Sequence, residues 1–220
     1  HEKDRERVMA YLDRLLTGSA ILPLEHRIIH KDGSVRWVRN TTVPNFAPDG
    51  PLLGYDALVT DITQQRSTEE KISKANRAYK TLSLCNQSLV RSTTEQSLLE
   101  NICHILVEQG GYALAWVGYA RQDEEKTIRL AAKAGNDLQF LSDLKLCWSA
   151  TQECGQKPAG VAIRTEKIVI NNNTHTAPYG EIWQETALRY GFLSSIAMPL
   201  FSEQKVFGIL NLYAQEMEAF

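Results

Sequence analysis

The sequence predicts an α+β protein in which one long helix separates two groups of antiparallel strands. Three observations carry this prediction. Residues 22–62 contain three strand-like runs joined by tight turns, with Asp32-Gly33 as a hairpin signal. Residues 63–91 hold almost no turn-forming residues and fit one continuous helix. Residues 92–220 alternate helical and strand-like segments in an order typical of a helix-flanked antiparallel sheet.

The first group begins with a short amphipathic helix over residues 1–16, which Gly18 ends. The strands are predicted at 22–30, 34–46 and 52–62, and the second turn lies at Pro48-Asp49-Gly50-Pro51. Two tight turns between consecutive strands imply an antiparallel meander.

The helix over residues 63–91 shows a heptad pattern. The predicted a positions are Gln65, Ile72, Tyr79 and Asn86, and the predicted d positions are Thr68, Ala75, Leu82 and Leu89. The polar a residues weaken such a seam and can fix its register. We therefore expect this helix to pair in parallel with its copy in a homodimer. The alternative is a single connecting helix that packs on its own domain.

The last block, 92–220, reads as one domain. Ser92-x-x-Glu95 fits a capping box for its first helix, which Gly110-Gly111 ends. A loop is expected over 135–158 and a polar loop over 171–180. Two further helices are expected at 159–165 and 181–190. The predicted strands are 112–120, 127–134, 167–170, 194–201 and 205–213.

Bulk properties exclude several classes of protein. The net charge of −2 offers no basic surplus for nucleic acid, and no apolar run approaches the roughly 18 residues that span a bilayer. The four cysteines, Cys85, Cys103, Cys147 and Cys154, form no C-x-x-C pair and no trusted zinc spacing. We expect free, reduced thiols in a cytoplasmic protein without a membrane segment.

Residues 1–63 resemble the C-terminal part of a PAS domain. The resemblance rests on Glu25-His26-Arg27, the run Lys31-Asp32-Gly33-Ser34-Val35-Arg36-Trp37-Val38, Asp49-Gly50, Gly54 and the closing Asp61-Ile62-Thr63. That family has a five-stranded antiparallel sheet, whereas this segment lacks the first two strands and the short helices that wall the ligand pocket. No flavin or haem ligand carries over, and the strand 52–62 is expected to present an open edge.

Residues 92–220 resemble a GAF domain, and 64–91 form a linker, or signalling, helix between the two domains. The resemblance rests on Gly111–Gly118, Gly160–Thr165, Trp183 with Ala187, Gly191–Ser195, Met198-Pro199-Leu200 and Gly208–Tyr213. The family usually adds a last helix beyond the point matched by Phe220. GAF domains of this kind accompany PAS domains upstream of histidine kinase, diguanylate cyclase or phosphodiesterase outputs, in two-component and related signal transduction.

The resemblance implies a sensory input and dimerisation module of a bacterial signal-transduction protein rather than an enzyme. No nucleophile, base and orienter can be assembled from the motifs, and no metal site is expected. The Asp123-Glu124-Glu125 cluster fits a solvated hairpin tip, and His175 fits a surface loop. An alternative follows from GAF relatives that reduce free methionine sulfoxide with pocket-loop cysteines, because Cys147 and Cys154 lie in the corresponding region.

The candidate ligand-binding residues are aromatic. Trp116, Trp148, Tyr179 and Trp183 stand in or near the segments that would line a GAF cavity, and aromatic walls with a few polar groups suit a small molecule. The reading that we favour is that they are simply core residues, since Trp and Tyr are commonly largely buried. The sequence names no cofactor and no ligand.

Overall fold

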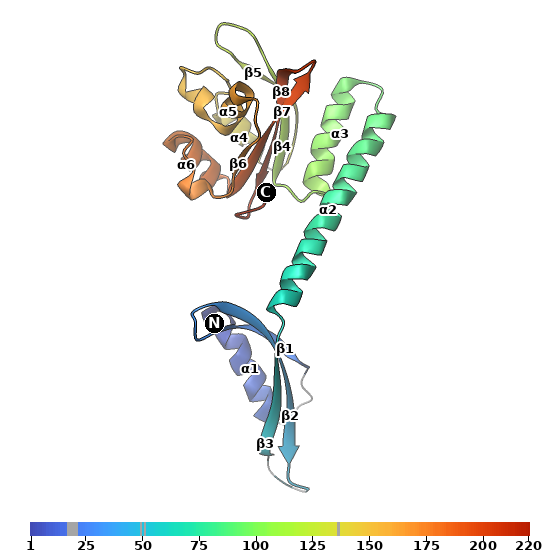
Figure 1. Cartoon of the computed structure of the whole chain (residues 1–220), viewed down its shortest axis with the longest axis vertical. Helices are drawn as coiled ribbons and strands as arrows, with labels where there is room; N and C mark the ends of the chain where they lie inside the picture. Colours follow the sequence, from blue (N-terminus) through green and yellow to red (C-terminus); the bar gives the residue numbers. More distant parts are fainter. Residues whose placement is uncertain (17–21, 49, 51, 136) are drawn as a thin grey trace. The chain divides into compact units, whose positions relative to one another are not determined.

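A computed structural model describes residues 1–16, 22–48, 50, 52–135 and 137–220 (Figure 1). The chain divides into two units, His1–Ala75 and Asn76–Phe220. The boundary falls inside one unbroken helix, α2 (Thr63–Arg91), which has the bounds that the sequence predicts.

The first unit contains one helix and a three-stranded sheet. The turn η1 (Glu2–Asp4) leads into α1 (Arg5–Leu16), and the strands are β1 (Leu24–Ile29), β2 (Val35–Phe46) and β3 (Leu52–Asp61). The strands form an antiparallel meander in the order β1-β2-β3, as predicted. Gly33 turns the first hairpin with a φ of 84°, a conformation that suits glycine. Gly18, Asp49 and Pro51 of the predicted turns lie outside the described residues.

The strand β3 has an open edge within the described part of the chain, because it pairs with β2 alone. Its side chains are also poorly covered, and Leu53, Leu58 and Val59 are all exposed. The predicted open edge is therefore present. The buried apolar residues of this unit are few: Tyr11, Leu15, Val38 and Ile62.

The main helices and strands of the second unit follow α2. They are α3 (Glu95–Glu108), β4 (Leu114–Ala120), β5 (Ile128–Gly135), α5 (Pro158–Thr165), β6 (Val169–Asn171), α6 (Glu181–Arg189), β7 (Ser194–Ser202) and β8 (Lys205–Ala214). Short turns complete it: α4 (Gln139–Asp143), η2 (Glu153–Gln156) and η3 (Thr174–Thr176). The five strands form an antiparallel sheet in the order β5-β4-β8-β7-β6.

The two faces of this sheet carry separate cores. The helix α3 covers one face, where Cys103 packs with Ala115, Val117 and Leu212. The helices α4, α5 and α6 cover the other face (Figure 1). Alternate residues of each strand therefore serve different layers, which is the usual consequence of the period-two geometry of strands.

Two local predictions are wrong. The cap of α3 is Thr94 and not Ser92: the Thr94 hydroxyl accepts a hydrogen bond from the Ser97 amide at 3.2 Å. Ser92 is unavailable as a cap because its amide still donates to the Ser88 carbonyl at the end of α2, at 2.9 Å. The expected loop over 135–158 contains two short helical segments, α4 and η2. Phe140 in α4 and Cys154 in η2 are buried, and the burial of these side chains stabilises both segments.

Candidate functional site

The start of α2 is fastened to the sheet of the first unit. The Asp61 carboxylate accepts a hydrogen bond from the Thr63 amide at 2.9 Å, and the Thr63 hydroxyl accepts one from the Trp37 amide at 2.9 Å. Ile62, between them, is buried, and its amide donates to the Trp37 carbonyl. The Asp-Ile-Thr motif thus caps the helix and ties it to β2.

Glu25 on β1 adds a charged clamp to the same joint. Its two carboxylate oxygens accept hydrogen bonds from Arg66 in α2 at 2.6 Å and from Arg39 in β2 at 2.8 Å. These bonds, that of Arg66 first, lower the pKa of Glu25. The Arg66 guanidinium also lies 4.1 Å from the centre of the Trp37 ring. The first turn of α2 therefore follows the position of β1 and β2.

Within the second unit, α2 has one buried side and one exposed side. Thr81 and Ser88 are buried and Cys85 is half-buried, and burial raises the pKa of the Cys85 thiol. A groove between α2 and α3 is lined by Leu84, Ser88, His104 and other residues of the two helices. The alternative that α2 packs on its own domain is thus correct for this side.

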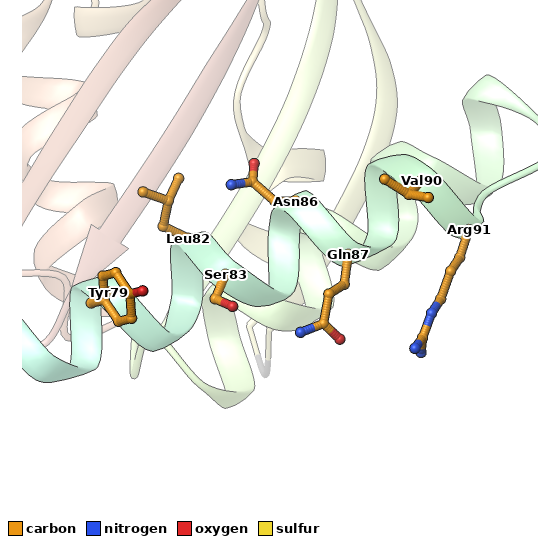
Figure 2. A pocket seen from close by; sticks show the side chains of 7 residues that line it. All are labelled: Tyr79, Leu82, Ser83, Asn86, Gln87, Val90 and Arg91. Carbon is orange, nitrogen blue, oxygen red and sulfur yellow. The ribbon is translucent and has the colours of Figure 1, made fainter.

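The opposite side of α2 carries the predicted seam. Tyr79, Leu82 and Leu89 expose 76%, 59% and 59% of their surface, and Asn86 is exposed as well. The predicted seam positions of the first unit, Gln65, Thr68, Ile72 and Ala75, are also exposed. Figure 2 shows a shallow depression on this side, lined by Tyr79, Leu82, Ser83, Asn86, Gln87, Val90 and Arg91. Every a and d position therefore remains free of contacts that would bury it.

The four candidate ligand residues belong to the face of the sheet covered by α4, α5 and α6. Trp116 on β4 and Trp183 on α6 are each 1% exposed and lie in one apolar cluster. Tyr179 is half-buried and meets Trp183 edge-on, with ring centres 5.7 Å apart. Trp148 also packs against this cluster, but its indole nitrogen donates to the Arg121 carbonyl at 2.9 Å and Lys126 covers its ring. Trp116 and Trp183 thus lie in the interior, and Tyr179 packs against Trp183. Trp148 lies at the edge of the same cluster.

Three further residues, Ser195, Asn211 and Tyr213, lie on this face. They are not among the site residues that the sequence predicts. All three are essentially buried, and Tyr213 belongs to the same cluster as Trp116. Desolvation raises the pKa of Tyr213 to about 12, partly offset by the indole groups of Trp183 and Trp116. A signal existed in the run Gly208–Tyr213, where Asn211 interrupts an otherwise apolar strand at an inward position.

The prediction of free thiols is wrong for two of the four cysteines. Cys147 and Cys154 form a disulfide with 5.4 Å between their Cα atoms, and both are buried. The helical turn η2 brings Cys154 back toward Cys147, an approach that sequence spacing alone does not reveal. Cys85 and Cys103 are free, and desolvation raises the pKa of Cys103 to about 12.

Arg164 on α5 holds the same loop. Its guanidinium donates to the carbonyls of Trp148 and Ser149, both at 3.1 Å, and to that of Gly155 at 2.5 Å. Gly155 is required there because a Cβ atom would lie 1.9 Å from the Ser149 carbonyl oxygen. The loop is therefore fixed by main-chain contacts as well as by the disulfide.

Comparison with known families assigns both units. A model of the GAF domain matches residues 92–220, more than half of the chain. The chain belongs to the GAF domain family. A model of the PAS fold matches residues 1–58, which include β1, β2 and most of β3. The PAS remnant and the GAF domain that the sequence suggested are thereby confirmed.

A curated relative is similar to nearly the whole chain. The chain is 24% identical over 226 residues to the methyl sulfide methyltransferase-associated sensor of Methanosarcina acetivorans. The alignment covers 98% of this chain and 21% of the relative, so the chain spans about a fifth of that protein's length. The likeness extends over both the PAS segment and the GAF domain.

Solved structures with similar folds include an enzyme and an isolated GAF domain. The free methionine-R-sulfoxide reductase of Neisseria meningitidis, in complex with its substrate, has a TM-score of 0.53 and 17% identity, over 67% of this chain and 78% of that one. The nlh2 GAF domain of A. aeolicus in an inactive state has a TM-score of 0.51 and 14% identity, over 64% and 80%. At these identities the likeness establishes the fold alone.

The described residues contain no group of three or more His, Cys, Asp or Glu side chains placed to hold a metal ion. Among the helices of the described ranges, none is long and apolar enough to cross a bilayer.

Proposed function

We propose that this chain is the input portion of a signal-transduction protein, in which a GAF domain receives a small molecule and α2 carries the resulting bias. The chain itself catalyses no reaction in this proposal. The sensor name of the Methanosarcina relative and the pairing of a PAS fold with a GAF domain support a sensory role. The output is a histidine kinase or an enzyme of cyclic-di-GMP metabolism, as in the proteins that this pair of domains resembles.

The exposed seam of α2 is the observation that carries the proposal. A helix of 29 residues is about 43 Å long and holds four heptads, enough for a two-stranded coiled coil. A second copy of this chain is the fitting partner, because in a parallel pair each a or d side chain meets its own copy. The polar residues Gln65 and Asn86 would then face their equivalents and fix the register.

The relay works by differential affinity. Because Asp61, Thr63 and Glu25 fasten the first turn of α2 to the PAS sheet, and Thr81 and Ser88 anchor its later turns in the GAF unit, a change in either unit biases the helix. A ligand shifts the balance only by as much as it prefers one arrangement of the paired helices over another.

The test is the molar mass of the whole chain by light scattering. We expect a dimer for the parent and a monomer for Leu82→Glu, which places two carboxylates opposite each other at a d position. The matched control is Ser73→Glu, which adds the same charge at an exposed b position and should leave the dimer intact. A monomeric parent, or a Leu82→Glu variant that dimerises as strongly as the parent, would show that α2 does not mediate pairing.

The second candidate function is thiol chemistry, which the Cys147–Cys154 disulfide favours. In such a reaction the two thiols would reduce a sulfoxide to a sulfide and water while forming one disulfide, and an external thiol would restore them. Incubation with free methionine sulfoxide and dithiothreitol separates the two candidates by mass spectrometry. Turnover that disappears in Cys147→Ser would establish the enzyme, whereas the sensor proposal predicts no turnover.

A further inference from the structure

The interior face of the GAF sheet holds a group of polar atoms without partners. They are the hydroxyl of Ser195, both Nδ2 and Oδ1 of Asn211, and the indole nitrogen Nε1 of Trp116, which makes no well-formed hydrogen bond although it interacts with the Tyr213 hydroxyl. The three residues are 1%, 1% and 0% exposed. A buried amide that makes no hydrogen bond is costly, and native proteins rarely keep one without a reason.

These atoms are neighbours because of the strand register. Trp116 on β4 stands directly opposite Asn211 on β8, and Ser195 on β7 stands opposite Tyr213, two residues beyond Asn211. Directly opposite residues in an antiparallel pair have Cβ atoms about 5 Å apart and point to the same side. Ala197, opposite Asn211 on β7, has no polar side-chain atom that could satisfy the amide.

The lack of partners is confined to this place among the described residues of the GAF unit. Asn171, on the same face, donates to the Thr174 hydroxyl at 3.1 Å. Ser194, the neighbour of Ser195 on the opposite face, donates to the Glu216 carbonyl at 2.7 Å. Buried Thr186 likewise donates to the Ile182 carbonyl within its helix. The fold therefore satisfies its buried polar groups elsewhere, and three adjacent residues on β4, β8 and β7 are the exception.

The surroundings are free of charge. Among the described residues of the GAF unit, none of the buried side chains is Asp, Glu, Lys, Arg or His. The walls are apolar and include Phe140, Ala187 and Phe192. A carboxylate or ammonium ion entering this interior would lose its hydration without meeting an opposite charge. The nearby Tyr213 is neutral at physiological pH, as a tyrosine ordinarily is, and desolvation raises its pKa further, to about 12.

We propose that Trp116, Asn211 and Ser195 recognise a small, uncharged ligand of the amide class. An amide carries a carbonyl acceptor for the N–H groups of Trp116 and Asn211 and an N–H donor for the Asn211 oxygen. Ser195 can donate or accept, so it adapts to either end of the ligand. The inference rests on the proposed sensory function and adds to it the chemical class of the signal.

The test uses three probes of nearly equal shape and different charge: acetamide, acetate and acetamidinium. The readout is the pair of cross-peaks from the Trp116 indole N–H and the Asn211 side-chain amide in 1H–15N spectra of the whole chain. Trp148, whose indole N–H is already bonded to the Arg121 carbonyl, supplies an internal control. With four heavy atoms, acetamide should bind with a dissociation constant on the order of millimolar.

We expect acetamide to shift the Trp116 and Asn211 peaks saturably, while acetate and acetamidinium leave them in place and Trp148 does not respond. Asn211→Leu should abolish the response, and the matched variant Asn171→Leu should keep it. Should Asn211→Leu fail to fold, Ser195→Ala serves instead and should weaken acetamide binding roughly fivefold, the loss of one hydrogen bond.

Three outcomes would overturn the inference. They are the absence of any acetamide shift, an equal response to acetate or acetamidinium, and an acetamide affinity that is unchanged by Asn211→Leu or by Ser195→Ala. A slowly exchanging water bonded to Asn211, with no acetamide shift, would assign these atoms to structural water. None of these results affects the dimer measured through Leu82→Glu, so failure here is distinguishable from failure of the proposed function.

Discussion

The PAS segment and the GAF domain are stabilised by different interactions. The PAS sheet has few buried apolar side chains and leaves Leu53, Leu58 and Val59 exposed, and it relies on ion pairs. The buried carboxylate of Asp4, in the turn η1, receives three hydrogen bonds from Arg27 at 2.6 to 2.9 Å. The GAF sheet is covered on both faces by apolar cores and buries no charge among its described residues.

This difference indicates where each unit can respond to its surroundings. Ion pairs near a surface respond to pH and salt and contribute modestly to stability. An apolar core with unpartnered polar atoms is stable through packing and responds to a ligand that completes its hydrogen bonds. The predictions below separate the two behaviours through Trp37, the one tryptophan of residues 1–75, and the tryptophans of the GAF domain.

The largest effect is expected at Trp116. Trp116→Ala should lower the free energy of unfolding of the GAF domain by about 3–5 kcal/mol, because the ring is fully buried and leaves a cavity. Urea unfolding followed through the Trp183 indole signal measures it. The control, Trp37→Ala, should leave that signal's midpoint unchanged, since Trp37 lies in the other unit. A parental midpoint for Trp116→Ala would contradict the packing.

The two buried asparagines should respond with opposite signs. Asn171→Leu leaves the buried Thr174 hydroxyl without its hydrogen-bond donor. It should lower the free energy of unfolding by about 1–3 kcal/mol. Asn211→Leu removes two unpartnered atoms and should raise the stability of the ligand-free protein by about 1 kcal/mol. Urea midpoints of both variants, without added ligand, decide the matter. Equal losses in the two variants would mean that Asn211 has partners in solution and would weaken the contrast between the units.

Acid should destabilise the PAS segment before the GAF domain. The hydrogen bonds from the Arg27 side chain, and then its amide, hold the pKa of Asp4 well below its usual range. A carboxyl group with a lowered pKa contributes stability that is present above its ordinary value, about 4, and is lost as the pH falls below it. Indole signals of Trp37 and Trp116, recorded between pH 6 and pH 3, should report unfolding of the first unit first.

The variant Asp4→Asn tests the cause of this order. It should be less stable than the parent at neutral pH and should show a weaker dependence on acid in the Trp37 signal. A pH profile identical to that of the parent would assign the acid response to other carboxylates, such as Glu25, whose pKa is also lowered.

The smallest effect is expected at the open edge of β3. Val59→Lys should reduce self-association that depends on this edge while leaving stability nearly unchanged, since Val59 is exposed and lysine protects strand edges. Sedimentation of the Leu82→Glu background, in which helix pairing is removed, isolates this contribution. Residual association in Leu82→Glu that Val59→Lys does not lower would show that the β3 edge plays no part in it.

Local patterns in the sequence predicted most of the fold. Turn chemistry and periodicity act over a few positions, so nearby residues are enough to predict such segments. Examples are the Asp32-Gly33 turn, the helix over 63–91 and the two strands within 194–213. The exposed seam of Tyr79, Leu82 and Leu89 was likewise readable as a heptad. Trp116 and Trp183, which the sequence offered as core or pocket residues, are both buried.

The tertiary structure alone decided the contacts that join distant segments. The approach of Cys154 to Cys147 depends on a turn and on Arg164 from the following helix. The choice of Thr94 over Ser92 as a cap depends on where α2 ends. The group formed by Trp116, Asn211 and Ser195 arises from the register of three strands, which sequence distance does not encode. Periodicity gives the face of each residue, but only the pairing of strands decides which polar atoms meet and which remain without a partner.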